Sequence, residues 1–367
     1  MVRVLPSLHQ SVRQHGHTSK LPGTQLPARM PSMQDLSLVD VLKIGQHGCF
    51  YIAKVTRGHC KGYRLVTCKL TMKTMPQKIL QSEIKIMKKL GYHRNVVQLL
   101  EWNVLEEPYI LIMEHVGRHN LKSFLQSNRS QLSGCRELQS KLTSAGYFIS
   151  LGMEHIASRK IVHRDLAARN ILVGRFPQEC KIAEFSMAVD ISVSGAKKQM
   201  RGSRNSCIPF RWYPPEYFTD GIYDLQGDVW AFGILLWELH SLGTSPYPGF
   251  ETAKEVVINI CSGYKMAAPL MCRREMYEVM EFCWTSRSEE RPVFSDIARY
   301  LEDVVENDAD YVKIEDCFEP NVPLGCSPPW SQSIPCQEET YMRDWMVRVN
   351  CPRGDAPRVG GSLTSLL

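Results

Sequence analysis

The pattern of apolar residues changes from strand-like to helix-like near residue 120, and this change most restricts the possible folds. Before it, short segments rich in β-branched and aromatic residues are divided by turns that contain glycine, a pattern that predicts strands. These segments are 38–45 (LVDVLKIG), 49–55 (CFYIAKV), 64–70 (RLVTCKL) and 109–116 (YILIMEHV). One helix is predicted among them, at 77–90, because its apolar residues recur near the helical period.

Beyond residue 120 the apolar residues follow a helical pattern. Helices are predicted at 138–158, 227–242, 253–263 and 274–284. We therefore predict an α+β fold with two lobes: a small antiparallel sheet with one helix, followed by a larger helical lobe. A cleft between two lobes is a common ligand site.

Composition sets the limits of the two lobes. Residues 1–36 and 304–367 are rich in Pro, Ser, Gln or Gly and lack apolar periodicity, so flexible tails are predicted there. The small lobe is then expected at 37–116 and the large lobe at 117–303. The net charge of +6 is spread along the chain, which suits an anionic small ligand and does not favour nucleic acid.

Cysteine usage and hydropathy bear on location. The 13 cysteines are scattered singly, with no C-x-x-C pair, so reduced thiols in a cytosolic protein are expected. The N-terminal residues lack the apolar core of a signal peptide. No stretch reaches the ~18 consecutive apolar residues of a membrane span. We expect a soluble cytoplasmic chain, with any membrane association made through partners.

The most specific motif is the run IVHRDLAARNILV at 161–173. A lone H-R-D triplet recurs by chance, but the whole run resembles the protein-kinase catalytic loop. The resemblance implies that Asp165 is the catalytic base, that Asn170 is a metal ligand, and that Arg169 stabilises charge on the transferring group. The A-A-R sequence at 167–169 is typical of tyrosine kinases. Downstream, Pro209, Arg211 and Trp212 resemble the segment that supports a substrate tyrosine.

Further matches extend the resemblance over residues 38–303. Lys69 in VTCK stands where a kinase lysine contacts the nucleotide phosphates, and Glu83 stands where a helix glutamate pairs with it. The segment LIMEHV resembles the hinge that binds adenine. The predicted ATP-binding residues are Gly45, Gly48, Ile52, Lys69, Met113, Glu114 and Val116. The implied partners are ATP, Mg²⁺ and a protein substrate that carries tyrosine.

Three matched residues are expected to hold the large lobe together. Asp228 resembles the residue that anchors the catalytic loop, and Glu216 and Arg291 resemble a buried ion pair. The link between NLKSFL and the next helix is short, which leaves no room for the long insert of platelet-derived growth factor receptors. The likeness is therefore to receptor tyrosine kinases of the fibroblast growth factor receptor and Tie-like type.

The glycine loop departs from the family pattern. It should read G-x-G-x-x-G so that backbone amides can close over the phosphates. Here, with no gap, Gly45, His47 and Phe50 take the three places; with one inserted residue, Gly48 takes the second place and Tyr51 the third. Either alignment puts an aromatic residue at the third glycine, which weakens the phosphate cradle.

The metal-binding D-F-G motif is also changed, to Glu184-Phe185-Ser186. Glu184 keeps a carboxylate but adds a methylene, whereas Mg²⁺ demands near-ideal octahedral geometry. The phenylalanine of the motif is retained as Phe185, so its apolar packing role is expected to remain. Ser186 replaces a glycine whose freedom at positive φ allows this segment to switch.

The activation segment, residues 184–212, contains no tyrosine. Receptor kinases carry tyrosines there, whose phosphates pair with the arginine of H-R-D, here Arg164. Either a serine (Ser192, Ser194, Ser203 or Ser206) supplies a phosphate, or this control has been lost. In the tail, Tyr311 in ADYVKI resembles receptor-tail tyrosines that recruit phosphotyrosine-binding modules, with an incidental tyrosine as the alternative.

Two hypotheses for function remain open at this point. The first is a protein-tyrosine kinase with reduced activity caused by impaired metal geometry. The second is a pseudokinase that acts as a binding scaffold or allosteric regulator. Retention of Lys69, Glu83, Asp165 and Asn170 favours chemistry, and the altered glycine loop, Glu184 and Ser186 disfavour efficiency. A fragment of a membrane receptor is a third interpretation, which would need an upstream apolar span.

Overall fold

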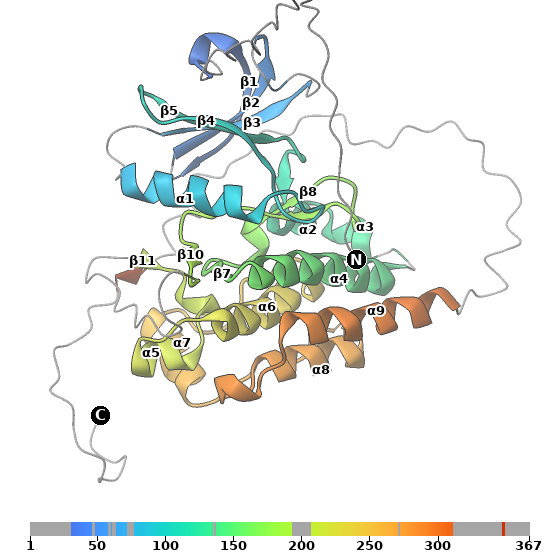
Figure 1. Ribbon diagram of the computed structural model, residues 1–367. Helices are drawn as coiled ribbons and strands as arrows, with labels where there is room; N and C mark the ends of the chain where they lie inside the picture. The colour runs from blue at the N-terminus through green and yellow to red at the C-terminus, as the bar shows by residue number, and fades with distance from the viewer. Residues whose placement is uncertain are drawn as a thin grey trace, which may run out of the picture. The chain divides into compact units, whose positions relative to one another are not determined.

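A five-stranded antiparallel sheet forms the small lobe, in the order β1-β2-β3-β5-β4 (Figure 1). The computed structural model describes residues 31–45, 48–57, 60, 64–71, 77–133, 135, 137–192, 207–270, 272–310 and 347–348. The strands are β1 (Leu36–Gly45), β2 (Gly48–Val55), β3 (Val66–Thr71), β4 (Leu99–Asn103) and β5 (Tyr109–Glu114). Among the described residues of this lobe, one α-helix, α1 (Gln77–Leu90), lies beside the sheet on the side of the helical lobe (Figure 1).

The large lobe is built from helices and short strands. Its helices are α2 (Leu121–Ser127), α3 (Arg129–Ser133), α4 (Leu138–Ser158), α5 (Pro215–Asp220), α6 (Leu225–His240), α7 (Ala253–Cys261), α8 (Arg274–Cys283) and α9 (Phe294–Asp310). Its short strands are β6 (His119–Asn120), β7 (Ile161–Val162), β8 (Ile171–Val173), β9 (Cys180–Ile182), β10 (Val189–Asp190) and β11 (Cys207–Ile208), which pairs with β12 (Val347–Arg348). The predicted two-lobed kinase fold is confirmed.

Short 3-10 helices complete the chain, at η1 (Met33–Asp35), η2 (Ala168–Asn170), η3 (Phe210–Trp212) and η4 (Ser288–Glu290). Two of them, η2 and η3, lie within segments that the sequence singled out, the catalytic loop and the substrate-supporting segment. The strand β4, with sequence LLEWN, and the helix α9 were not among the predicted elements. The apolar residues of α9 nevertheless recur at helical spacing, and Ile297, Ala298 and Leu301 are buried.

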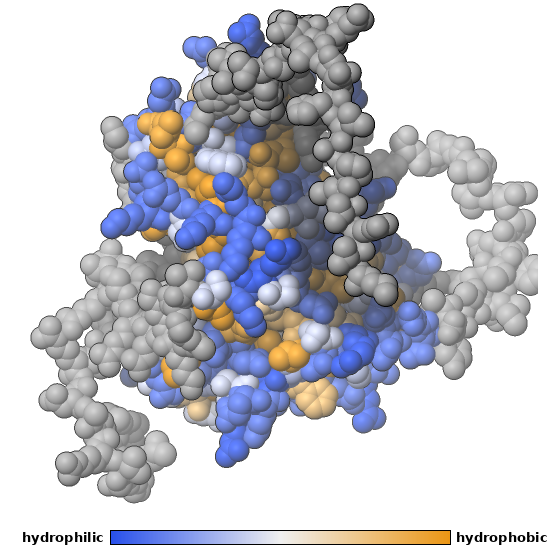
Figure 2. Space-filling model, viewed as in Figure 1, coloured by the Kyte–Doolittle hydropathy of each residue, from blue (hydrophilic) through white to orange (hydrophobic). Residues whose placement is uncertain are grey.

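The sheet separates two apolar clusters. One face packs a small cluster that includes Ala53, Val66 and Cys68. The opposite face belongs to the main cluster, which contains Leu111 and Met113 and continues into the helical lobe. Because side chains alternate between the two faces of a strand, the residues of β5 divide between these clusters. Hydrophilic side chains cover much of the visible surface (Figure 2).

Ordered structure extends beyond the lobe limits predicted from composition. At the N-terminal side, Ser32 and Asp35 form a capping box at η1, and Asn103 Nδ2 donates to the carbonyl of Pro31 at 2.9 Å. At the other end, α9 runs to Asp310, so the limit predicted at residue 303 falls inside a helix. No helix in the described ranges has the length and hydropathy to cross a membrane.

Candidate active site

A buried ion pair joins the sheet to the helix of the small lobe. Lys69, in the middle of β3, donates from Nζ to both carboxylate oxygens of Glu83 on α1, at 2.8 and 2.9 Å. The side chains are only 1% and 3% exposed. Buried charges of this kind are stable only when paired. The two residues that the kinase resemblance pairs are therefore in contact.

Glu184 makes a second contact with the same lysine. Lys69 Nζ lies 3.3 Å from Glu184 Oε1, and Ser186 Oγ donates to that oxygen at 3.0 Å. Burial would lower the pKa of Lys69, but the negative charges of Glu184 and Glu83 raise it above its usual value. The lysine is therefore held as an ammonium between two carboxylates.

The backbone at Glu184 adopts an unusual conformation. Its φ of 69° lies in the left-handed region, which costs an L-residue roughly 1 kcal/mol. Ser186 is not among the residues with positive φ. The residue with positive φ in this arrangement is therefore Glu184, whereas the sequence led us to expect it at Ser186. Phe185 is buried and packs edge-on against the His163 ring, with the centroids 5.2 Å apart.

The catalytic-loop residues converge on one carboxylate. Asn170 Nδ2 donates to Asp165 Oδ2 at 2.7 Å and to the Asp165 carbonyl at 2.8 Å. Arg169 donates to the other carboxylate oxygen, Oδ1. The Arg169 guanidinium also lies over the Trp212 ring, 4.3 Å from its centroid. The predicted base, cation and metal ligand are thus adjacent, next to the segment predicted to support tyrosine.

A buried aspartate on α6 fixes the backbone of this loop. Asp228 accepts hydrogen bonds from the amides of His163 and Arg164 at 2.6 and 2.9 Å, and from the Tyr223 hydroxyl at 3.2 Å. Burial raises the pKa of Asp228 to about 7, although these hydrogen bonds oppose the rise. The predicted anchoring contact is present. It also holds Arg164 in a positive-φ conformation, with φ of 68°.

Glu238, also on α6, is a site residue that sequence reasoning missed. Its Oε2 accepts from the amide of Ala168 at 2.9 Å and from Trp212 Nε1 at 2.9 Å. The carboxylate is fully buried, and burial raises its pKa. It therefore links the catalytic loop to the substrate-supporting segment. Its position inside an apolar helix, LLWELH, was the available indication, because a buried acid requires partners.

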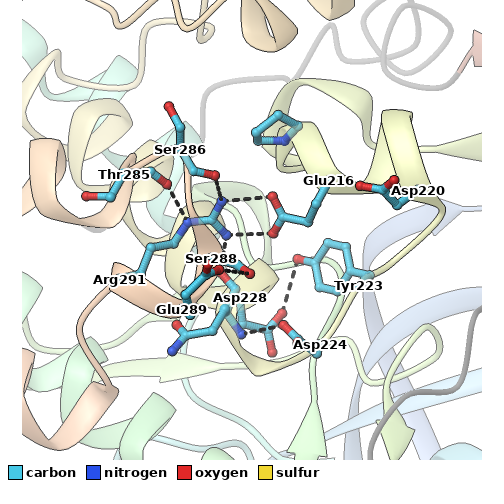
Figure 3. Close-up of polar contacts among 12 residues, drawn as sticks. Glu216, Asp220, Tyr223, Asp224, Asp228, Thr285, Ser286, Ser288, Glu289 and Arg291 are labelled. Carbon is cyan, nitrogen blue, oxygen red and sulfur yellow. Dashed lines mark hydrogen bonds and ion pairs between the residues drawn. The ribbon is translucent and has the colours of Figure 1, made fainter. Parts of the chain in front are cut away.

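A second ion pair ties the large lobe together at its base (Figure 3). Arg291 donates to both carboxylate oxygens of Glu216, at 2.6 and 2.8 Å, and its Nε donates to the carbonyl of Thr285 at 2.9 Å. The Arg291 side chain has no exposed surface, and its guanidinium lies 5.1 Å from the Trp230 ring centroid. The predicted pairing of Glu216 with Arg291 is present.

The segment predicted to bind adenine lies at the end of β5. Met113 is buried, and Val116 is half-buried. The Glu114 carboxylate accepts two bonds from Lys181 Nζ, both at 2.8 Å, while the Glu114 amide donates to the Gln98 carbonyl at 3.0 Å. The amide of Glu114 is therefore not available to an adenine ring.

Strand pairing shows which aromatic residue faces Lys69. Phe50 pairs with Lys69, and Tyr51 pairs with Cys68, which belongs to the cluster on the opposite face. Residues directly opposite in an antiparallel pair lie on the same face of the sheet. The Lys69 ammonium is 5.3 Å from the Phe50 ring centroid. Phe50 thus lies where the ungapped alignment places the third glycine.

The other predicted residues of the glycine loop lie before and after Phe50 along the β1–β2 hairpin. Gly45 and Gly48 pair across the β1–β2 hairpin, and Gly48 has φ of 127°, a conformation that favours glycine. Ile52 pairs with Thr67 and is 2% exposed. It therefore lies on the same face as Phe50 and Lys69, two residues along the strand.

The residues predicted to bind metal supply suitable donors. Glu184 and Asn170 offer a carboxylate and an amide oxygen, and the Ala183 amide donates to the Asn170 carbonyl at 2.9 Å, which keeps the two segments adjacent. Magnesium takes hard oxygen ligands, commonly one or two carboxylates together with substrate phosphates. No cluster of three His, Cys, Asp or Glu suited to a metal occurs in the described residues. The donor set fits Mg²⁺ bound jointly with phosphates.

The start of the activation segment is tied to α1. Lys89 Nζ donates to Asp190 Oδ1 at 2.7 Å and to Ser192 Oγ at 2.8 Å. Ser194, Ser203 and Ser206 lie outside the described residues, as does Tyr311. The Arg164 guanidinium lies 5.8 Å from the Tyr223 ring centroid. The proposed phosphorylation sites thus remain predictions.

Comparison with known proteins places the chain in a family. The profile of the family described as protein tyrosine and serine/threonine kinase matches residues 36–301. The chain belongs to this kinase family. The matched range contains every residue predicted to act in catalysis, nucleotide binding or metal binding.

Relatives of the kinase domain are receptor tyrosine kinases. Tyrosine kinase receptor Cad96Ca of Drosophila melanogaster is 37% identical over 261 residues, 68% of this chain and 32% of the relative. Fibroblast growth factor receptor 1 of Pleurodeles waltl is 36% identical over 234 residues, 61% of this chain and 28% of the relative. Fibroblast growth factor receptor homolog 1 of Drosophila melanogaster is 34% identical over 247 residues, which is 64% of this chain and 33% of the relative.

These matches confirm the predicted resemblance to receptor tyrosine kinases. The chain spans about a third of the length of the curated relatives it matches. Protein kinases as a class use ATP and a divalent metal ion. In this kinase domain Lys69 contacts Glu83 and Glu184, and Asn170 contacts Asp165. The Ala183 amide, next to Glu184, donates to the Asn170 carbonyl.

Proposed function

We propose that this kinase domain transfers the γ-phosphate of ATP to tyrosine side chains of proteins, with reduced activity. The observation that carries the proposal is that two groups of contacts occur together. Lys69 contacts Glu83, and both Asn170 and Arg169 contact Asp165. A domain that only binds a partner has no physical need for both. The sequence A-A-R at 167–169 and Trp212 beside Arg169 support tyrosine as the acceptor.

Each residue has a role in the proposed reaction. Asp165 accepts the proton of the tyrosine hydroxyl while that oxygen forms a bond to the γ-phosphorus, and the bond to the ADP oxygen breaks. Lys69, oriented by Glu83, contacts the nucleotide phosphates. Arg169 stabilises charge on the transferring group. Glu184 and Asn170 would hold Mg²⁺, which supplies positive charge at the phosphates when bound.

The adenine and glycine-loop residues complete the proposed nucleotide site. Gly45, Gly48 and Ile52 would cover the nucleotide. The backbone carbonyl of Glu114 and the backbone groups of Val116, beside Met113, would bind adenine.

A cytoplasmic location belongs to the same proposal, as do phosphotyrosine-binding modules at Tyr311. The limit between the lobes at residues 116 and 117 also belongs to this proposal.

A scaffold without turnover is the second candidate function. The observation that favours it is the occupation of Lys69: two carboxylates and the Phe50 ring already surround its ammonium. A nucleotide phosphate must compete with these groups. The two candidate functions differ in whether the carboxylates and the Phe50 ring can move away from Lys69 to admit a phosphate.

Replacing Glu184 with Asp is expected to raise phosphotransfer about tenfold. The shorter side chain would withdraw the carboxylate from Lys69 and restore the reach of the usual metal ligand, and errors of about 1 Å in a site can cost about 100-fold in rate. The measurement is transfer of radiolabelled phosphate from Mg·ATP to a tyrosine-containing polymer.

Glu306→Asp is the matched control, because Glu306 is exposed on α9 and should leave the rate unchanged. Equal rates for the wild type and Glu184→Asp would contradict the claim that Glu184 impairs the enzyme. Absence of transfer by both, with no thermal stabilisation by ATP or Mg·ATP, would favour the scaffold.

A further inference from the structure

The ring of Phe50 has two lysine ammonium groups beside it. Lys69 Nζ on β3 is 5.3 Å from the ring centroid, and Lys43 Nζ on β1 is 5.9 Å from it. Both lysines pair with Phe50 in the sheet, so the three side chains share one face. A cation is attracted to the face of an aromatic ring, and more strongly where water is excluded. These contacts hold Phe50 over Lys69.

The consequence for Lys69 is complete enclosure. The residue as a whole is 0% exposed, Glu83 and Glu184 lie within 3.3 Å of Nζ, and the Phe50 ring lies over it. A phosphate oxygen that approaches this ammonium from the side of residue 50 therefore has to displace the ring. A glycine at residue 50 would have no side chain to move.

Phe50 lies at the Lys69 end of the proposed nucleotide site, and other residues of the sheet lie toward the hinge. Ile52 and Thr67 form the next pair on the same face, and Met113 pairs with Thr67 from β5. Two residues along a strand correspond to about 6.8 Å. The Phe50 ring therefore lies at the part of the cleft nearest Lys69, where phosphates would lie, and one residue pair away from the part near the hinge.

We propose that Phe50 makes this cleft selective for nucleosides over nucleoside triphosphates. Adenosine binds with the Phe50 ring in place, whereas ATP binds only when the ring leaves Lys69. The inference rests on the proposed function in one respect, that this cleft is the nucleotide site. It adds a specificity-determining residue that the family pattern lacks, since the ungapped alignment places the third glycine there.

The test compares identical changes at two neighbouring aromatic residues. Affinities of the wild type, Phe50→Gly and Tyr51→Gly for adenosine and for ATP are measured by titration calorimetry without metal. Phe50→Gly should bind ATP about tenfold more tightly, equivalent to about 1.4 kcal/mol, and adenosine within about twofold of the wild type. Tyr51→Gly should bind both ligands as the wild type does, because Tyr51 pairs with Cys68.

Three results would overturn the proposal: unchanged ATP affinity in Phe50→Gly, an equal gain for adenosine, or failure of adenosine to bind the wild type. Phe50→Leu guards against loss of folding in the glycine variant, since it keeps an apolar side chain and removes the aromatic face. It should bind ATP about threefold more tightly. It should also speed acetylation of Lys69 by acetic anhydride, read by peptide mass spectrometry, at least threefold; an unchanged rate would overturn the proposal.

The outcomes also separate this inference from the proposed function. If Phe50→Gly gains ATP affinity but no variant transfers phosphate to a tyrosine polymer, the selectivity stands and the kinase activity fails. If the wild type transfers phosphate and Phe50→Gly binds ATP no better, the activity stands and the role of Phe50 fails.

Discussion

Replacing Asp165 with Asn is expected to lower phosphotransfer by about 100- to 10,000-fold, the usual contribution of a general base. Asp165 accepts hydrogen bonds from Asn170 on one carboxylate oxygen and from Arg169 on the other. An asparagine amide cannot accept the hydroxyl proton, and its NH₂ group would face one of these donors. The rate of labelled phosphate transfer to a tyrosine polymer measures the loss.

Asp303→Asn is the control for this change, since Asp303 is exposed on α9 and its replacement should leave the rate unaltered. Thermal unfolding with and without ATP shows whether the Asp165 variant still folds and binds nucleotide. Transfer by Asp165→Asn at more than half the wild-type rate would show that another group acts as base, or that the labelling is not produced by this site.

Replacing Arg291 with Met is expected to lower the free energy of unfolding by about 3–5 kcal/mol. The change leaves the Glu216 carboxylate without the two hydrogen bonds it receives, and the carbonyls of Thr285 and Gln226 without the donors that Arg291 provides. Because the arginine side chain is fully enclosed, water cannot easily take its place. Denaturant unfolding measures the difference.

The matched control is Arg299→Met on α9. Arg299 pairs with Asp296 at 2.7 Å, but the two side chains are 73% and 53% exposed. Such surface pairs contribute about 0.2–1 kcal/mol, so this variant should unfold nearly as the wild type does. The double variant Glu216→Gln, Arg291→Met should be more stable than Arg291→Met alone, because it removes the unpaired charge. Equal losses for Arg291→Met and Arg299→Met would contradict the role assigned to the buried pair.

Elements with strong periodicity were predicted well from the sequence. Helix 77–90 matches α1, and helix 138–158 matches α4, because an apolar stripe at the helical period has few other ways to be buried. The strand β4 was missed, since LLEWN lacks alternation and is defined by pairing with β5. The structure has a contact at Pro31 and a helix that runs to Asp310, outside the limits of 37 and 303 predicted from composition, because contacts with distant residues and helix continuation are not visible in composition.

Within the candidate site, fixed motifs carried the prediction. The run at 161–173 placed Asp165, Arg169 and Asn170 within a few residues of each other, and a short loop cannot separate them widely. Glu238 was missed, because the bonds that explain it come from Ala168 and Trp212, far from it in sequence. The catalytic and binding roles of the predicted residues stay predictions.

The sequence by itself determined the family and the two lobes, and it predicted the catalytic carboxylates, since these follow from local motifs and apolar periodicity. Only the tertiary structure decided what surrounds Lys69. Strand pairing puts Phe50, and not Tyr51, over its ammonium, and Glu184 reaches it from 115 residues away. No local pattern could give this arrangement, because a sheet face and a contact between lobes exist only once the chain has folded.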